Sequence, residues 1–104
     1  MKHIFVAIAT LAAGIAASTP VMADLALATA KNCMACHAVD KKLVGPSVKD
    51  IAIKYSGQND APEKLAIKVL KGSVGAWGVV PMPANTQVSP DEAKKLVAWV
   101  LATK

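Results

Sequence analysis

The chain has 104 residues, of which 54% are hydrophobic and 4% aromatic, and its formal net charge is +5 at neutral pH. This length allows one small domain, and domains of this size are marginally stable unless a disulfide, a metal or a cofactor adds buried contacts. The 12 basic side chains are all lysines scattered along the chain, a distribution that argues against a nucleic-acid-binding protein.

Residues 1–23 have the pattern of a secretory signal peptide. Lys2 and His3 precede an apolar run over 4–17, and small residues follow it up to Ala23. The run is shorter than the roughly 20 residues of a membrane-spanning helix. We therefore expect cleavage after Ala23, which makes 1–23 the signal peptide and 24–104 the mature domain, exported to the periplasm without stable membrane insertion.

The hydrophobic spacing of the mature domain is helical, and no strand pattern is visible. Apolar residues three, four and seven positions apart predict short helices over about 25–33, 47–55, 61–71 and 90–101. The fold class is therefore predicted to be all-α.

The last of these helices has the clearest start. Ser89 suits the N-cap, Pro90 the first helical position, and Glu92 can complete a capping box with Ser89. Residues 72–88, in contrast, contain three glycines and two prolines and follow neither a helical nor a strand period. So long an irregular stretch in a small domain indicates a functional segment.

The motif Cys33-Met34-Ala35-Cys36-His37 is the attachment signature of a c-type haem. Two thiols at this spacing can each bond one haem vinyl group, and the imidazole of His37 then lies at the iron as an axial ligand. One covalent haem c would also supply the apolar bulk that the chain lacks.

Three other readings of the cysteines are weaker. A zinc site needs four nitrogen or sulfur ligands, and Cys33, Cys36 and His37 supply three. A haem-free thiol oxidoreductase would place the two cysteines in a βαβ unit, for which there is no strand pattern. A disulfide between them would close a loop too short to stabilise the domain much.

The sixth iron ligand follows from counting. The candidates are a methionine sulfur, a lysine nitrogen or an open site; Met1 and Met22 leave with the signal peptide, and Met34 lies inside the attachment turn. Met82 remains, stiffened by a proline on each side. A closed His37/Met82 site favours an electron carrier that is not an enzyme, because no iron position is left for a substrate. The alternative is a haem enzyme or gas-binding sensor with an open sixth site.

The chain resembles the small bacterial cytochrome c-551/c-552 group of class I cytochromes c over nearly all of 24–104. The resemblance is carried by five motifs: Cys33–His37, Val44-Gly45-Pro46, Gly75-Ala76-Trp77-Gly78, Val80-Pro81-Met82-Pro83 and Ala98-Trp99-Val100-Leu101. It implies a cytochrome c fold of about four short helices around one covalently bound haem, with His37 and Met82 as its axial ligands.

The resemblance also implies four supporting roles. The Pro46 carbonyl would bond the ligating imidazole, Trp77 and Lys68 would lie near the haem propionates, and Asn85 would brace the Met82 loop. The ordinary readings are a turn for Pro46, core packing for Trp77 and a solvated charge for Lys68.

The sequence thus predicts a periplasmic, monomeric one-electron carrier between respiratory complexes and terminal reductases or oxidases. Its partners would be an electron donor and an acceptor with acidic docking faces. The expected docking surface is the haem edge beside Cys33 and Cys36, rimmed by lysines such as Lys31, Lys41 and Lys42.

Overall fold

The computed structural model describes residues 20–104, and over this range the chain is helical. Its elements are α1 (Pro20–Ala30), the 3-10 turn η1 (Cys33–Ala35), α2 (Val48–Lys54), α3 (Ala61–Lys71) and α4 (Pro90–Ala102). No strand occurs between residues 20 and 104, where the sole β-type pairing is an isolated bridge of Ser73 with Met82. The predicted all-α class is confirmed.

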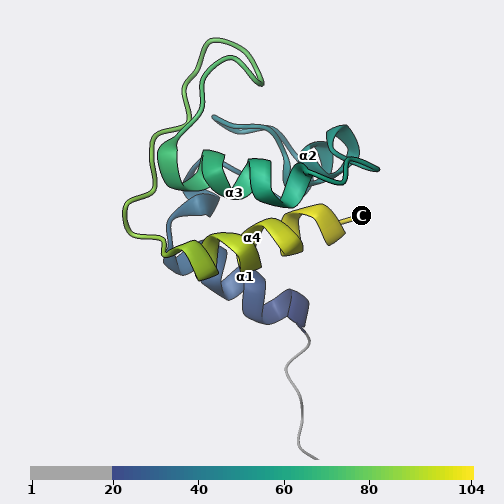
Figure 1. Cartoon of the computed structure of the whole chain (residues 1–104), viewed down its shortest axis with the longest axis vertical. Helices are drawn as coiled ribbons and strands as arrows, with labels where there is room; N and C mark the ends of the chain where they lie inside the picture. The colour runs from purple at the N-terminus through teal and green to yellow at the C-terminus, as the bar shows by residue number, and fades with distance from the viewer. Residues whose placement is uncertain (1–19) are drawn as a thin grey trace, which may run out of the picture.

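Helix α4 is the centre of the domain. It contacts α1, α2 and α3, and Figure 1 shows it lying between α3 and α1. Its apolar face packs into a single cluster whose buried members are Ala28, Val48, Tyr55, Ala61, Leu65, Ala66, Val88, Ala93, Leu96, Val97 and Trp99. Because four of these are alanines, the protein core is small.

The capping box predicted for α4 is present. The Ser89 hydroxyl accepts the backbone N–H of Glu92 at 3.2 Å, and the Glu92 carboxylate accepts the backbone N–H of Ser89 at 3.0 Å. Two otherwise unsatisfied donors of the first helical turn are thereby paired, and loss of such a cap typically costs about 1 kcal/mol.

Helices α2 and α3 lie where the hydrophobic spacing predicts them. Ser47 is the N-cap of α2 and accepts the backbone N–H of Asp50 at 3.0 Å, and Tyr55 is its C-cap. Helix α3 begins at Ala61 with Pro62 in its first turn and ends before Gly72, as expected.

Helix α1 starts earlier and ends earlier than predicted. It begins at Pro20, and cleavage after Ala23 would remove about its first turn. After Ala30 the chain passes through Asn32, whose left-handed φ of 65° turns it into η1. Most of the predicted signal peptide, residues 1–19, lies outside the described residues. Within 20–104, no helix is both long and apolar enough to span a bilayer.

The segment 72–88 is irregular, as predicted, but it is not without order. Ser73 and Met82 bond each other reciprocally through their backbones, at 3.0 and 2.8 Å. The chain between them forms a loop that projects from the end of α3 and then returns toward the start of α4 (Figure 1). This pairing fixes the backbone of Met82.

Candidate haem-binding site

Cys33 and Cys36 lie on and directly after the 3-10 turn η1. Both thiols are half-buried and unpaired, so the two cysteines form no disulfide with each other. The backbone N–H groups of Cys36 and His37 both donate to the Cys33 carbonyl, at 3.3 and 3.1 Å. These bonds hold the two cysteines and the histidine on one tight turn.

The electrostatics of the turn disfavour dithiol chemistry. Burial raises the pKa of the Cys33 thiol, and a backbone hydrogen bond offsets only part of that effect. Disulfide exchange needs a thiolate, which this shift disfavours at neutral pH. Zinc is disfavoured as well, since no three His, Cys, Asp or Glu side chains in residues 20–104 are grouped to hold a metal ion.

The imidazole of His37 is oriented by the loop that follows it. Its Nδ1 lies 2.7 Å from the Pro46 carbonyl oxygen. Because a carbonyl oxygen only accepts, Nδ1 carries the hydrogen and Nε2 keeps a lone pair. The ring is therefore in the tautomer that a metal-ligating histidine needs.

Gly45 makes this approach possible. A Cβ atom at this position would lie 2.6 Å from Cε1 and 2.9 Å from Nδ1 of His37, closer than such atoms can come. The Gly45 N–H donates to the Cys36 carbonyl at 2.8 Å, which ties the loop back to the cysteine turn. The Gly45-Pro46 pair thus packs against the ring and bonds it.

Met82 is half-buried and held at both its backbone polar groups by Ser73. Gly72, with φ of 84°, lies directly against it: a Cβ on Gly72 would be 2.8 Å from the Met82 carbonyl oxygen. The backbone of the predicted sulfur ligand is therefore positioned by the end of α3.

Asn85 joins the Met82 loop to α3. Its side-chain amide donates to the Val69 carbonyl at 2.9 Å and to the Pro83 carbonyl at 3.3 Å, and its backbone N–H also donates to Val69 at 3.1 Å. The bond to Pro83 reaches the residue next to Met82.

Trp77 and Lys68 both meet the end of α2. Lys68 Nζ lies 3.2 Å from the Tyr55 hydroxyl. Trp77 is 43% exposed and so is not a core residue; Lys54 Nζ lies 4.5 Å from its ring centroid and donates to the Ala76 carbonyl at 2.7 Å. The sequence analysis did not identify Lys54, because contacts 22 residues apart leave no local signal in the sequence.

Lys31, predicted to rim a docking surface, is partly buried and bonds other parts of the domain. Its ammonium pairs with Glu92 at 3.2 Å and donates to the Gln87 carbonyl at 3.1 Å. Lys41 and Lys42 are exposed, as a docking role requires.

The residues fit a haem c. They supply two thiols on one turn, an imidazole with a free Nε2 and a thioether on a fixed backbone. The segments between His37 and α2 and between α3 and Met82 carry large exposed apolar side chains, which suit the border of an apolar ring: Leu43, Val44, Val74, Trp77, Val79 and Val80.

Comparison with known proteins identifies the family. The cytochrome c family model matches residues 25–104. Cytochrome c-552 of Nitrosomonas europaea is 49% identical over 100 residues, which are 96% of this chain and 92% of that protein. Cytochrome c-551 of Stutzerimonas stutzeri is 42% identical over 105 residues, covering 100% of both chains. The crystal structure of the Nitrosomonas europaea protein superposes with a TM-score of 0.75 at 50% identity, covering 77% of this chain and 99% of that one.

The chain therefore belongs to the cytochrome c family. Its relatives further define it as a small class I c-type cytochrome of the c-551/c-552 group, an electron carrier that binds a single covalently attached haem c. The predicted family, fold and cofactor are confirmed.

Proposed function

We propose that this chain is a periplasmic one-electron carrier whose haem is attached to Cys33 and Cys36 and ligated by His37 and Met82. When bound, the haem supplies an iron that cycles between its ferric and ferrous states by single electrons. The protein's part is to hold both axial ligands in the two states, so that little reorganisation accompanies each transfer. With both positions filled, the chain is a carrier and not an enzyme.

The His37–Pro46 hydrogen bond is the observation that carries this proposal. At 2.7 Å it fixes the tautomer that leaves Nε2 free for iron, and it orients the ring. The imidazole belongs to the residue directly after Cys36, so haem attachment and ligation use the same turn.

The pairing of Met82 with Ser73 supports the second ligand. Thioether sulfur is a weak donor, so its loop must keep it in place without help from a strong metal bond. The reciprocal backbone bonds, the close approach of Gly72 and the amide of Asn85 all act on this short segment. Methionine opposite histidine also raises the reduction potential of a cytochrome c.

Five further residues complete the proposed site. Pro46 orients His37, and Asn85 braces the Met82 loop. Lys68 and Trp77 lie near the propionates, with Lys54 holding Trp77 through its ring and through the Ala76 carbonyl. Lysine offers a propionate a point charge without the bidentate grip of arginine.

Substitution of Met82 tests the ligand assignment. In the oxidised holoprotein, Met82→Ala is expected to abolish the methionine–iron charge-transfer band and to lower the reduction potential markedly, while haem stays attached. Met34→Leu is the matched control, because Met34 packs against the core cluster. This control substitution should leave the charge-transfer band and the reduction potential unchanged. An unaltered potential in Met82→Ala would show that Met82 is not a ligand.

The extent of the matches to relatives supports the proposed cleavage and export. The family model begins at residue 25, and 99% of the crystallised Nitrosomonas europaea chain is covered by 77% of this one. Intact mass is expected to give a chain starting at Asp24 with one haem added. A chain still carrying residues 1–23 after export would refute cleavage.

The partners are proposed to be respiratory redox proteins with acidic docking faces, met by a monomer through exposed lysines such as Lys41 and Lys42. Attraction of this kind is screened by salt. Electron transfer to the anionic oxidant hexacyanoferrate should slow as ionic strength rises, and less steeply in the Lys41→Gln/Lys42→Gln variant. If the electron-transfer rate depended equally on salt in both proteins, these lysines would not be part of the docking surface.

A further inference from the structure

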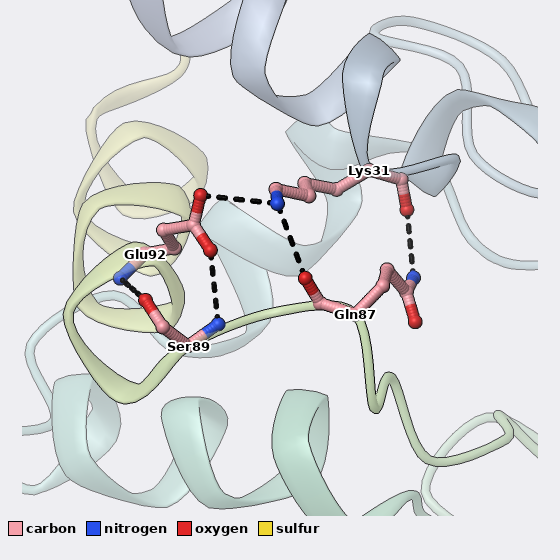
Figure 2. A network of polar contacts seen from close by, with 4 residues as sticks. All are labelled: Lys31, Gln87, Ser89 and Glu92. Carbon is pink, nitrogen blue, oxygen red and sulfur yellow. Dashed lines mark hydrogen bonds and ion pairs between the residues drawn. The ribbon is translucent and has the colours of Figure 1, made fainter.

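Lys31 and Gln87 bond each other twice, although they lie 56 residues apart in the chain. The Lys31 ammonium donates to the Gln87 backbone carbonyl at 3.1 Å, and the Gln87 side-chain amide donates to the Lys31 backbone carbonyl at 2.9 Å. Figure 2 shows the two residues side by side with both bonds drawn. We call this reciprocal pair the Lys31–Gln87 clamp.

The clamp joins the two segments that carry the proposed haem ligands. Lys31 follows the last residue of α1 and lies two positions before Cys33, at the entrance to the cysteine turn. Gln87 lies between Met82 and the N-cap of α4, where the Met82 loop ends. The clamp therefore links the start of the attachment turn to the end of the methionine loop.

A third contact holds Lys31 in place. Its ammonium pairs with Glu92 at 3.2 Å, and the two side chains are only 26% and 29% exposed. Glu92 also accepts the N–H of Ser89, so the ion pair and the cap of α4 share one carboxylate (Figure 2). The ion pair thus holds the Lys31 side chain against α4, where its ammonium also reaches the Gln87 carbonyl.

From Gln87 the contacts continue to Met82. The Gln87 amide also donates to the Asn85 side-chain oxygen at 3.2 Å. The Asn85 amide in turn donates to the Pro83 carbonyl at 3.3 Å. The chain of bonds runs from the Lys31 carbonyl through Gln87 and Asn85 to the residue beside Met82.

We propose that Gln87 and Lys31 are positioning residues for the sulfur of Met82. Cross-linking the loop's end to the cysteine turn reduces the conformations open to the loop, and so favours the bound position of a weak ligand. The inference rests on the proposed function, in which Met82 ligates the iron. Gln87 itself is exposed, so its amide acts through these bonds and not through burial.

Competition with imidazole measures this positioning directly. Imidazole added to the oxidised holoprotein displaces methionine, and its apparent affinity rises when the methionine is held less firmly. Gln87→Met removes the amide at nearly constant side-chain length. We expect about fivefold tighter imidazole binding in this variant, the factor that matches one lost hydrogen bond. Lys31→Met should act in the same direction.

Two further variants separate positioning from general stability. Thr103→Val removes a bond from the Thr103 hydroxyl to the Trp99 carbonyl at the far end of α4, and should destabilise the fold to urea without changing imidazole affinity. Glu92→Gln removes the charge that pairs with Lys31 but keeps a carbonyl for Ser89. If Glu92→Gln tightens imidazole binding less than Lys31→Met does, the difference in affinity is due to loss of the Lys31–Gln87 clamp.

Two results would overturn the positioning role of Gln87 and Lys31. Unchanged imidazole affinity in Gln87→Met, or a change no larger than that of Thr103→Val at equal loss of stability, would overturn it while Met82 remained a ligand. If Met82→Ala itself neither abolished the charge-transfer band nor tightened imidazole binding, the proposed ligation would fail, and the positioning role with it.

Discussion

The contact between Gly45 and His37 shows how one missing side chain positions an imidazole ring. The ring lies so close to Gly45 that a Cβ would sit 2.6 Å from Cε1, and the next residue's carbonyl bonds Nδ1. A glycine is needed here for space. Gly57, with φ of 77° and nothing within 4 Å of its would-be Cβ, is needed instead for its backbone conformation.

This difference gives a prediction. Gly45→Ala should displace the His37 ring, destabilise the holoprotein by about 1–3 kcal/mol through overpacking, and shift the reduction potential and the visible spectrum. Gly57→Ala should cost about 1–2 kcal/mol through backbone strain alone, with the spectrum and potential intact. Urea unfolding with spectroscopy on both variants checks this; a Gly45→Ala spectrum identical to that of the wild type would contradict it.

Individual residues differ in how far the sequence reveals them. His37 was predicted from the attachment motif and Met82 by counting the remaining possible ligands, arguments that need no coordinates. Lys54 and Gln87 were not predicted, because each acts on a segment distant in the chain, across 22 and 56 residues. Lys31 shows the same limit: its bonds to Glu92 and Gln87 were not predicted, because both partners lie far from it along the chain.

At the scale of elements, the start of α4 combines a cap with an ion pair. The Ser89 backbone N–H, with a smaller contribution from Lys31, holds the pKa of the Glu92 carboxyl below its usual range. A carboxyl with a lowered pKa in the folded state stabilises the fold above its unfolded pKa, which is about 4.3. That contribution is lost as the pH falls through the lower, folded value.

The pH dependence of stability should therefore differ between the wild type and Glu92→Gln. At pH 7 the wild-type holoprotein is expected to resist urea better than the variant. As the pH falls through the lowered, folded pKa the gap should close, since the carboxyl is then neutral in both states. Urea unfolding of the two proteins at several pH values checks this, and a gap independent of pH would contradict the assignment.

The helices were predictable where local chemistry marks their ends. Ser89, Pro90 and Glu92 define the start of α4, and Pro62 and Gly72 bound α3. The predicted beginning of α1 at about residue 25 missed Pro20, because this proline lies inside the segment interpreted as the signal peptide. The Ser73–Met82 pairing was invisible for another reason: it depends on how the segment 72–88 folds back on itself.

At the scale of the whole molecule, the protein core is small for a stable domain. It is built from the inner faces of four short helices, and four of its eleven buried members are alanines. Large apolar side chains such as Val44 and Val79 stay exposed, the latter at 92%. We therefore expect the covalent haem to supply much of the buried apolar contact of the fold.

Loss of haem attachment should consequently unfold the chain. Cys36→Ala is expected to disrupt maturation and to leave an apo-chain with little helical signal in circular dichroism at 25 °C. The wild-type holoprotein, measured alongside, should show the helix content of α1 to α4. A stably helical apo-chain would contradict a haem-dependent core.

The visible spectrum of the purified protein tests the central claim, a closed haem site ligated by His37 and Met82, most directly. We predict a methionine–iron charge-transfer band in the oxidised protein and no rapid, high-affinity binding of carbon monoxide by the reduced protein. A spectrum without that band, together with tight carbon monoxide binding, would contradict the account and indicate an open site.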